Sequence, residues 1–357
     1  MGLIPCPQRN FRDPQAPTDR LAPPAFRSLC NQVVDTDAPN LILNMLVSNR
    51  DDLTLHLVNN GIRLPGPIVV VGEVLWDVFP ESVLLGGAPL NFAAHAARLG
   101  HDAILISGLG NDELGDRASK EIAELGLPAD RICKSVRYKT GTALVTLDEE
   151  GQPGFRIERP AAYDDISLNA DELRNLGNLD PSWLYYGTLL ASTEHGMATL
   201  QELLKALPRA SRFYDLNLRS GFERAEVVSQ LIAAADVVKL NESEAAAVST
   251  LFGLPKELEG FCRHGAERFG WRAACVTLGE RGCIIFNDGE FVHADGHSVE
   301  VADTVGAGDA FAAAFLHGLI NGWPVQKIAS FANRVGALVA SRPGAIPAWS
   351  VAEAVAL

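Results

Sequence analysis

The sequence feature that most constrains the fold is a series of apolar, strand-like runs that alternate with helical segments. The first run, Ile68–Val71, is continuous and leads directly into Gly72 and Glu73. A continuous run of this kind is typical of a central strand in an α/β sheet. Polar residues follow most of the later runs, so we expect a mostly parallel central sheet with the functional site along one edge. Those later runs are Trp183–Tyr186, Phe213–Tyr214, Val237–Leu240 and Ala274–Leu278.

A second informative stretch is Asp303–Asp309, which reads Asp-Thr-Val-Gly-Ala-Gly-Asp and precedes the helix-forming run Ala310–Phe315. It predicts a tight turn that opens into a buried helix, with Asp309 in the first turn. The glycines allow consecutive N–H groups to point into one cavity, and the helix start adds partial positive charge, which suits an anion. A carboxylate beside such a turn is what phosphoryl transfer to a hydroxyl requires. The alternative is that Asp309 only caps the helix or complements its dipole.

The double-glycine turn Gly86-Gly87 introduces a third element, an Ala-rich helix that ends at Gly100. Asn91 falls in the first turns of this helix, on the side where the glycines would admit a ligand. Asp77 comes just past the end of the first strand region, where ligands bind in open α/β sheets. The alternatives are a local cap for Asn91 and a solvated turn for Asp77.

The segment Gly108–Gly115 looks superficially like a nucleotide loop, but its spacing argues against this interpretation. It lacks the dinucleotide pattern, and Asp116 and Arg117 stand where a phosphate-binding loop of Walker type carries Lys and Ser or Thr. We therefore expect a loop followed by a helix start.

The pattern of Thr142–Leu147 and Phe155–Arg159 predicts a hairpin. Antiparallel strands inside a βα chain indicate an excursion from the main sheet, and we expect a lid hairpin at about residues 140–162 that excludes water from a site.

Residues 1–65 are Pro-rich and polar, with little periodicity. They predict a poorly ordered N-terminal extension, with the folded domain in residues 66–357.

Composition excludes several functional classes. The net charge is −14 and no Lys/Arg cluster occurs, so nucleic acid and anionic membranes are not expected as partners. No apolar run reaches the roughly 20 residues of a membrane helix. The six cysteines form no CxxC pair and no secretory signal precedes them, which predicts reduced thiols in a cytoplasmic protein.

Taken together, these segments resemble the PfkB/ribokinase family of carbohydrate kinases over roughly residues 68–350. The motifs that carry the resemblance best are Gly86–Gly100 and Asp303–Asp309, about two hundred residues apart. The runs Asp215–Arg219, Asn241–Glu244 and Thr277–Gly282 also match the family. The resemblance implies a three-layer αβα sandwich with a mostly parallel central sheet and a small β lid. It also implies an ATP-dependent sugar kinase.

The resemblance further implies roles at matching positions. Asp309 would take the proton from a sugar hydroxyl, and the backbone N–H groups of Gly306, Ala307 and Gly308 would stabilise charge on the transferring phosphate. Asp77, Gly86, Gly87 and Asn91 match sugar-binding positions, and Arg219 would contact the substrate or phosphate, with a surface salt bridge as its alternative.

The remaining roles concern ATP, Mg²⁺ and K⁺. Asn241, Glu244, Thr277, Gly279, Gly282 and Asn333 match the nucleotide site. Glu244 would contact Mg²⁺ through water. Asp303, the Val305 carbonyl and Ser341 in the 341–345 loop resemble a monovalent-cation site, usually occupied by K⁺.

The motifs favour fructose as the substrate, because the residues after Gly86-Gly87 and the run Arg159–Asp164 are similar to those of bacterial fructokinases. Ribose, a ketodeoxy sugar acid and a nucleoside stay open as alternatives.

Only eight residues separate Asp77 from Gly86, so the first lid segment is short and a homodimer formed through the lid is in doubt. A nicotinamide-dependent dehydrogenase is disfavoured because no GxGxxG follows the first strand. A non-catalytic regulatory relative is disfavoured because Asp309 is present.

Overall fold

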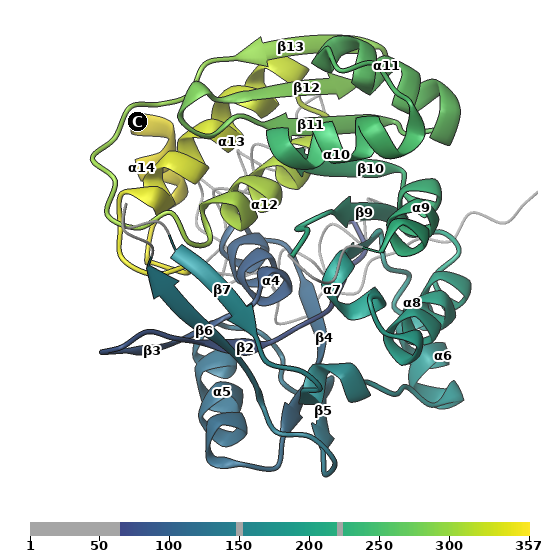
Figure 1. Ribbon diagram of the computed structural model, residues 1–357, viewed down its shortest axis with the longest axis vertical. Coiled ribbons are helices and arrows are strands. Elements are labelled where there is room, and N and C mark those ends of the chain that lie inside the picture. The colour runs from purple at the N-terminus through teal and green to yellow at the C-terminus, as the bar shows by residue number, and fades with distance from the viewer. Residues whose placement is uncertain (1–64, 148–152, 220–223) are drawn as a thin grey trace, which may run out of the picture. The chain divides into compact units, whose positions relative to one another are not determined.

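The computed structural model describes residues 65–147, 153–219 and 224–357, and for residues 145–147 and 153–155 it describes the backbone alone. The described residues belong to one compact unit. The extension predicted for residues 1–65 lies outside the described residues except for Pro65. Figure 1 shows the arrangement of the described elements.

A nine-stranded sheet forms the centre of this unit, in the order β13-β12-β11-β10-β9-β8-β1-β4-β5 (Figure 1). Every neighbouring pair from β11 to β5 is parallel, and β12 and β13 add antiparallel pairs at one edge. The strands are β1 Ile68–Val71, β4 Ala103–Gly110, β5 Ile132–Ser135, β8 Trp183–Gly187, β9 Ser211–Asp215, β10 Val237–Asn241, β11 Ala273–Thr277, β12 Cys283–Asn287 and β13 Glu290–Ala294. The mostly parallel sheet expected from the apolar runs is confirmed.

Helices cover both faces of this sheet because alternate strand residues point to opposite sides. On one side, Val70 packs in a core with residues of α4, α5, α12, α13 and α14. On the other side, Val69 and Val71 pack with residues of α6 to α11. The helices are α4 Ala88–Arg98, α5 Glu113–Glu124, α6 Ala170–Asn178, α7 Thr188–Ala191, α8 Glu194–Ala206, α9 Ala225–Ala234, α10 Glu242–Phe252, α11 Leu258–Phe269, α12 Ala307–Ile320, α13 Val325–Ala340 and α14 Val351–Ala356, with short 3₁₀ turns η2 Ala162–Asp165 and η3 Gly279–Arg281. The three-layer αβα sandwich is confirmed.

A separate four-stranded sheet forms the lid, in the order β3-β2-β6-β7. It combines the hairpin of β2 Leu75–Val78 and β3 Val83–Gly86 with that of β6 Gly141–Leu147 and β7 Pro153–Ile157. β2 and β6 pair in parallel and join the two hairpins. The predicted hairpin is thus confirmed, and the short first lid segment is a tight hairpin of its own.

The prediction of a loop over Gly108–Gly115 was wrong in its first part. β4 continues to Gly110, which pairs with Ser135 of β5, and α5 begins at Glu113. A Cβ on Gly108 would lie 2.2 Å from the Ala162 carbonyl oxygen. The glycine therefore lets the backbone at Ala162 approach β4 closely, and it does not bend the strand.

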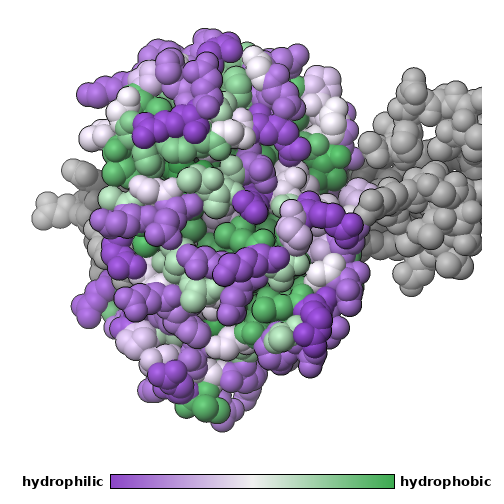
Figure 2. Space-filling model, turned by 90° about the vertical axis from the view of Figure 1, so that its right-hand side faces the viewer, coloured by the Kyte–Doolittle hydropathy of each residue, from purple (hydrophilic) through white to green (hydrophobic). Residues whose placement is uncertain are grey.

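The surface on the side of α6, α8 and α9 is shown in Figure 2, where hydrophilic residues predominate and hydrophobic ones form small separate groups. Among the described residues, no helix combines the length and apolar character that a membrane crossing needs.

Candidate active site

A cavity of about 230 Å³ opens between the lid, the start of α4 and the turn before α12. It brings together eight of the predicted site residues, namely Asp77, Gly87, Asn91, Arg219, Val305, Gly306, Gly308 and Asp309. Glu73, Ala143, Leu189 and Asn217 also line it. The two motifs that are distant in sequence therefore meet at one cavity, at the carboxyl-terminal edge of the central sheet.

Asp309 lies in the first turn of α12 and is buried. Its Oδ2 accepts a hydrogen bond of 2.8 Å from Asn91 Nδ2. Burial and the nearby Asp215 carboxylate raise the pKa of Asp309 to about 6, against the lowering effects of Lys239 and Asn91. A carboxylate with such a pKa is mostly ionised at neutral pH and still basic enough to accept a proton.

The turn before α12 has the geometry expected of an anion site. Gly306 is the N-cap residue and has φ 77°, a left-handed conformation that glycine adopts without strain. The Ala307 N–H donates a long hydrogen bond of 3.3 Å to the Thr304 carbonyl. Within the described chain, the N–H groups of Gly306 and Gly308 donate no backbone hydrogen bond. These two groups are therefore the better placed anion donors.

Two more buried carboxyl groups, Glu73 and Asp77, line the cavity. Burial raises the pKa of Glu73 to about 7 and that of Asp77 to about 6, and the charge of Asp309 adds to both shifts. The predicted Gly86 lies against Asp77, because a Cβ there would be 2.5 Å from Asp77 Oδ2. Glu73 was not predicted, although its position directly after the glycine at a strand end is the signal that could have found it.

A buried ion pair beneath the turn was also not predicted. Lys239 Nζ lies 3.0 Å from Asp215 Oδ1, and the Tyr185 hydroxyl donates to Asp215 Oδ2 at 3.0 Å. A Cβ on Gly308 would lie 3.5 Å from Lys239 Nζ, so the ammonium sits directly against the turn. Burial lowers the pKa of Lys239, but Asp215, Asp309 and Glu244 outweigh burial and raise it above its ordinary value. Lys239 therefore carries a positive charge beside the predicted anion site.

Asn241 and Glu244 form a reciprocal cap at the start of α10. Glu244 Oε2 accepts from the Asn241 N–H and Oε1 accepts from the Leu218 N–H, both at 2.8 Å. The segment predicted to bind nucleotide is thereby tied to the 215–219 run that reaches the cavity. Because backbone groups hold both carboxylate oxygens, the geometry suits a water-mediated contact to Mg²⁺ better than direct coordination.

The other residues predicted to bind nucleotide lie outside the cavity lining, around β11 and β13. Thr277 ends β11 and its hydroxyl donates to the Leu240 carbonyl at 3.3 Å. Gly279 is the first residue of the η3 turn, and Gly282 directly follows the turn. Asn333 of α13 donates to the carbonyls of Ala294 and Asp295. Asn333 therefore fixes the chain after β13, a positioning contact that sequence alone did not indicate.

The residues predicted to bind a monovalent cation lie on two adjoining loops. Asp303 Oδ1 accepts from the Val305 N–H at 2.9 Å, and Oδ2 accepts from the Gly344 N–H at 3.1 Å. The Ser341 hydroxyl donates to the Leu338 carbonyl at 2.8 Å, which leaves its lone pairs available. Carboxylate, carbonyl and hydroxyl oxygens form a hard donor set, so these residues fit K⁺.

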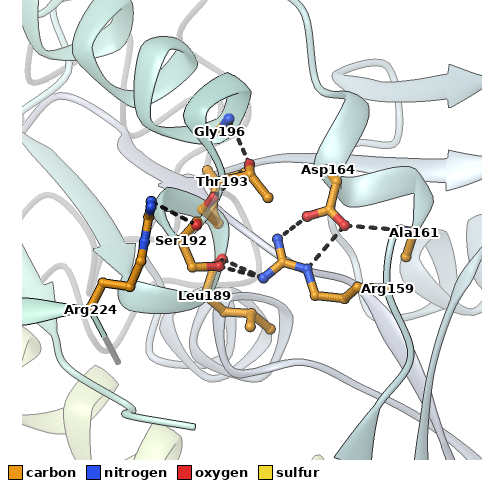
Figure 3. Close-up of polar contacts among 9 residues, drawn as sticks. Arg159, Ala161, Asp164, Leu189, Ser192, Thr193, Gly196 and Arg224 are labelled. Carbon is orange, nitrogen blue, oxygen red and sulfur yellow. Dashed lines mark hydrogen bonds and ion pairs between the residues drawn. The ribbon is translucent and has the colours of Figure 1, made fainter. Parts of the chain in front are cut away.

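Arg159 joins the base of the lid to α7 (Figure 3). Its guanidinium pairs with Asp164, with Nε 3.1 Å from Asp164 Oδ2, and also donates to the Leu189 carbonyl at 3.1 Å and to Ser192 Oγ. Arg224 donates to the Ser192 carbonyl from the other side at 3.0 Å. Since Leu189 lines the cavity, this network fixes one wall of it relative to the lid.

Residues 72–352 match the family described as pfkB family carbohydrate kinase. The chain is 32% identical over 302 residues to a fructokinase of Klebsiella pneumoniae, which covers 79% of this chain and 96% of the relative.

Two solved structures share the fold. One is a fructokinase double mutant from Vibrio cholerae O395 in fructose-, ADP- and potassium-bound form, with a TM-score of 0.69 and 23% identity over 82% of this chain and 99% of that one. The other is a 2-dehydro-3-deoxygluconokinase from Thermotoga maritima, with a TM-score of 0.73 and 21% identity over 82% of this chain and 98% of that one. At these identities the structural likeness concerns the fold alone.

Proposed function

Since the chain belongs to the pfkB family of carbohydrate kinases and is a sugar phosphotransferase, we propose that its acceptor is fructose and that Asp309 is the general base. The observation that carries this proposal is the pairing of Asp309 with Asn91 at the turn before α12. A base and an anion-binding turn adjoin one cavity there, as phosphoryl transfer requires.

In the proposed reaction, Asp309 accepts the proton of a sugar hydroxyl while the hydroxyl oxygen bonds to the γ-phosphorus of ATP. The bond between that phosphorus and the bridging oxygen breaks, and ADP leaves. The N–H groups of Gly306 and Gly308, with a weaker contribution from Ala307, stabilise the charge on the transferring phosphoryl group. Lys239 adds positive charge beneath the turn.

The electrostatics of the cavity favour an uncharged sugar. Its lining contains the carboxyl groups of Glu73, Asp77 and Asp309, whereas Arg219 is the only cation among the lining residues, all of which belong to the described chain. A sugar acid would bring a further negative charge beside three carboxyl groups. Hydroxyl groups can instead donate hydrogen bonds to them. The fructokinase relative at 32% identity supports the same choice.

Asp77, Gly86, Gly87, Asn91 and Arg219 are the proposed sugar-binding set, and Asn241, Glu244, Thr277, Gly279, Gly282 and Asn333 are the proposed nucleotide set. Bound Mg²⁺ would neutralise phosphate charge, with Glu244 contacting it through water. Asp303, Val305 and Ser341 would hold K⁺, which the Vibrio cholerae relative has bound.

A cytoplasmic location is part of the proposal, and the free state of Cys133, Cys262, Cys275 and Cys283 supports it. A homodimer formed through the lid, with its short β2–β3 hairpin, stays a prediction, and the molar mass in solution would test it.

A ketodeoxygluconate kinase is the second candidate, because Arg219 reaches the cavity and offers one guanidinium to a carboxylate. The test measures ADP release from Mg-ATP in the presence of K⁺ and compares four acceptors, namely fructose, ribose, 2-dehydro-3-deoxygluconate and adenosine. The fructose proposal expects kcat/KM for fructose to exceed the others by at least about tenfold. A preference for the sugar acid would replace fructose and keep the mechanism, whereas no turnover with any acceptor would contradict the proposal.

A further inference from the structure

His95 occupies a position on α4 that the proposed reaction does not use directly. It lies one helical turn after Asn91, so both side chains leave the same face of the helix. Its ring is fully buried. His95 Nδ1 lies 3.1 Å from the Trp349 Nε1, and His95 Nε2 lies 3.1 Å from the Ala345 carbonyl oxygen.

These two contacts determine which ring nitrogen carries the proton. An indole N–H can only donate, so Nδ1 must accept the hydrogen bond from Trp349. Nε2 then carries the proton and donates to the Ala345 carbonyl. Burial, together with the charge of Arg98, lowers the pKa of His95 to about 4 although the Ala345 contact opposes this, so the ring is neutral at physiological pH.

The carbonyl that His95 holds is in direct contact with the turn before α12. A Cβ on Gly306 would lie 2.4 Å from the Ala345 oxygen and 2.6 Å from its Cα. The two loops are joined a second time by Asp303, which accepts from the N–H groups of both Val305 and Gly344. A shift of Ala345 would therefore move the backbone of Gly306.

We propose that His95 is a positioning residue for phosphoryl transfer, because its Nε2–H holds the Ala345 carbonyl against Gly306 and so fixes the anion-binding turn. The inference rests on the proposed function, since it assigns the turn a role in the reaction. It makes α4 responsible for both parts of the site. Asn91 orients Asp309, and His95, one turn later, fixes the turn that faces the phosphate.

Two substitutions separate this role from a packing role. His95→Leu removes the donor at similar volume, and His95→Gln retains an N–H that can reach the Ala345 carbonyl. We expect His95→Leu to lower kcat with fructose by on the order of 10²-fold, with KM for fructose and ATP within about twofold of wild type. His95→Gln should recover most of kcat. His264→Leu, at an exposed position of α11, is the matched control and should leave kcat unchanged.

Amide hydrogen exchange of the apoprotein supplies a readout that needs no substrate. We expect faster exchange in peptides covering residues 303–310 and 341–346 of His95→Leu, with His95→Gln close to wild type. If His95→Leu does not fold, Trp349→Phe carries the test, because it removes the indole donor to His95 Nδ1, and we expect faster exchange in the same peptides of that variant.

Unchanged exchange in these peptides of His95→Leu, or an unchanged kcat of that variant, would overturn the proposal. A fall in kcat together with a rise in KM in both His95 variants would also overturn it, because that result indicates a packing role alone. Faster exchange without turnover of any acceptor by wild type would remove the catalytic role together with the proposed function, while leaving the His95–Ala345 contact established.

Discussion

Asn91 Nδ2 lies 2.8 Å from Asp309 Oδ2, a contact between residues 218 positions apart in the sequence. Each residue stands in the first turns of its own helix, α4 or α12. An amide N–H that donates to a carboxylate stabilises the ionised form and fixes its orientation. The contact therefore favours the ionised form of Asp309 in a buried setting that otherwise favours the neutral acid, as the proposed role of a base requires.

Replacing Asp309 with Asn tests the base directly. The variant keeps the shape of the side chain but cannot accept a proton, so we expect kcat to fall by about 10²–10⁴-fold. Binding of ATP, measured by calorimetry, should stay within about threefold of wild type, because Asp309 is proposed to act on the sugar hydroxyl. Asp116→Asn, in the first turn of α5, is the control and should leave kcat unchanged. Wild-type turnover in Asp309→Asn would exclude the mechanism.

Replacing Asn91 with Ala tests the orientation and the charge of the base together. Loss of the amide donor should raise the pKa of Asp309 above its value of about 6. Because the reaction needs the carboxylate, the acidic limb of the kcat/KM profile should move to higher pH, by about one unit for a charge-assisted hydrogen bond. The profile is measured between pH 5 and 9. A limb that stays in place, or moves to lower pH, would show that Asn91 does not control this group.

The sequence predicted the central sheet and the two motifs for a simple physical reason. A continuous apolar run such as Ile68–Val71 is stable only as a strand that is covered on both faces of a sheet. In a parallel sheet, the polar residues that follow such strands lie at the same edge of the sheet. Gly306 and Asp309 could be identified from the sequence because few residue types suit a tight turn before a helix. The fold and the residues around the cavity follow from such local rules.

The contacts that support the site were not predictable in the same way. Lys239 lies within an apolar run and looks anomalous there, but its partner Asp215 is 24 residues away. Their pairing requires knowing that β9 and β10 are neighbours. His95 stands in an Ala-rich helix, where the sequence indicates only close packing. Its partners Ala345 and Trp349 come from the far end of the chain.

A buried histidine outside the cavity lining, His317, predicts acid sensitivity of the fold. Burial, His101 and Lys327 lower the pKa of His317 to about 3, whereas an unfolded histidine titrates near 6.5. As pH falls below 6.5 the unfolded chain binds a proton that the folded chain does not bind. The free energy of unfolding should therefore decrease with falling pH until about pH 3, by roughly 5 kcal/mol in total.

The measurement is urea unfolding of wild type and His317→Phe at pH 7 and pH 4.5. Phenylalanine suits the aromatic surroundings of Trp323 and Phe331 and cannot bind a proton. The difference in unfolding free energy between the two pH values should be smaller in the variant. His264→Gln, exposed on α11, should keep the wild-type difference. Equal pH dependence in His317→Phe and wild type would contradict the assignment.

The Lys239–Asp215 pair allows stability and catalysis to be separated. Lys239→Met should destabilise the protein by about 3–5 kcal/mol, because it leaves the Asp215 carboxylate buried without its cation. Adding Asp215→Leu removes that unpaired charge, so the double variant should regain most of the lost unfolding free energy. The exposed pair of Lys134 and Asp116 is the matched control, and Lys134→Met should cost less than about 1 kcal/mol.

Catalysis should not return with stability in the double variant. The Lys239 ammonium lies against Gly308, beneath the turn that is proposed to bind the phosphate, and methionine cannot replace its positive charge. We therefore expect kcat at least about tenfold below wild type in Lys239→Met/Asp215→Leu, at near wild-type unfolding free energy. Recovery of both quantities would assign the pair to folding alone, whereas recovery of stability without turnover places the Lys239 charge in the reaction.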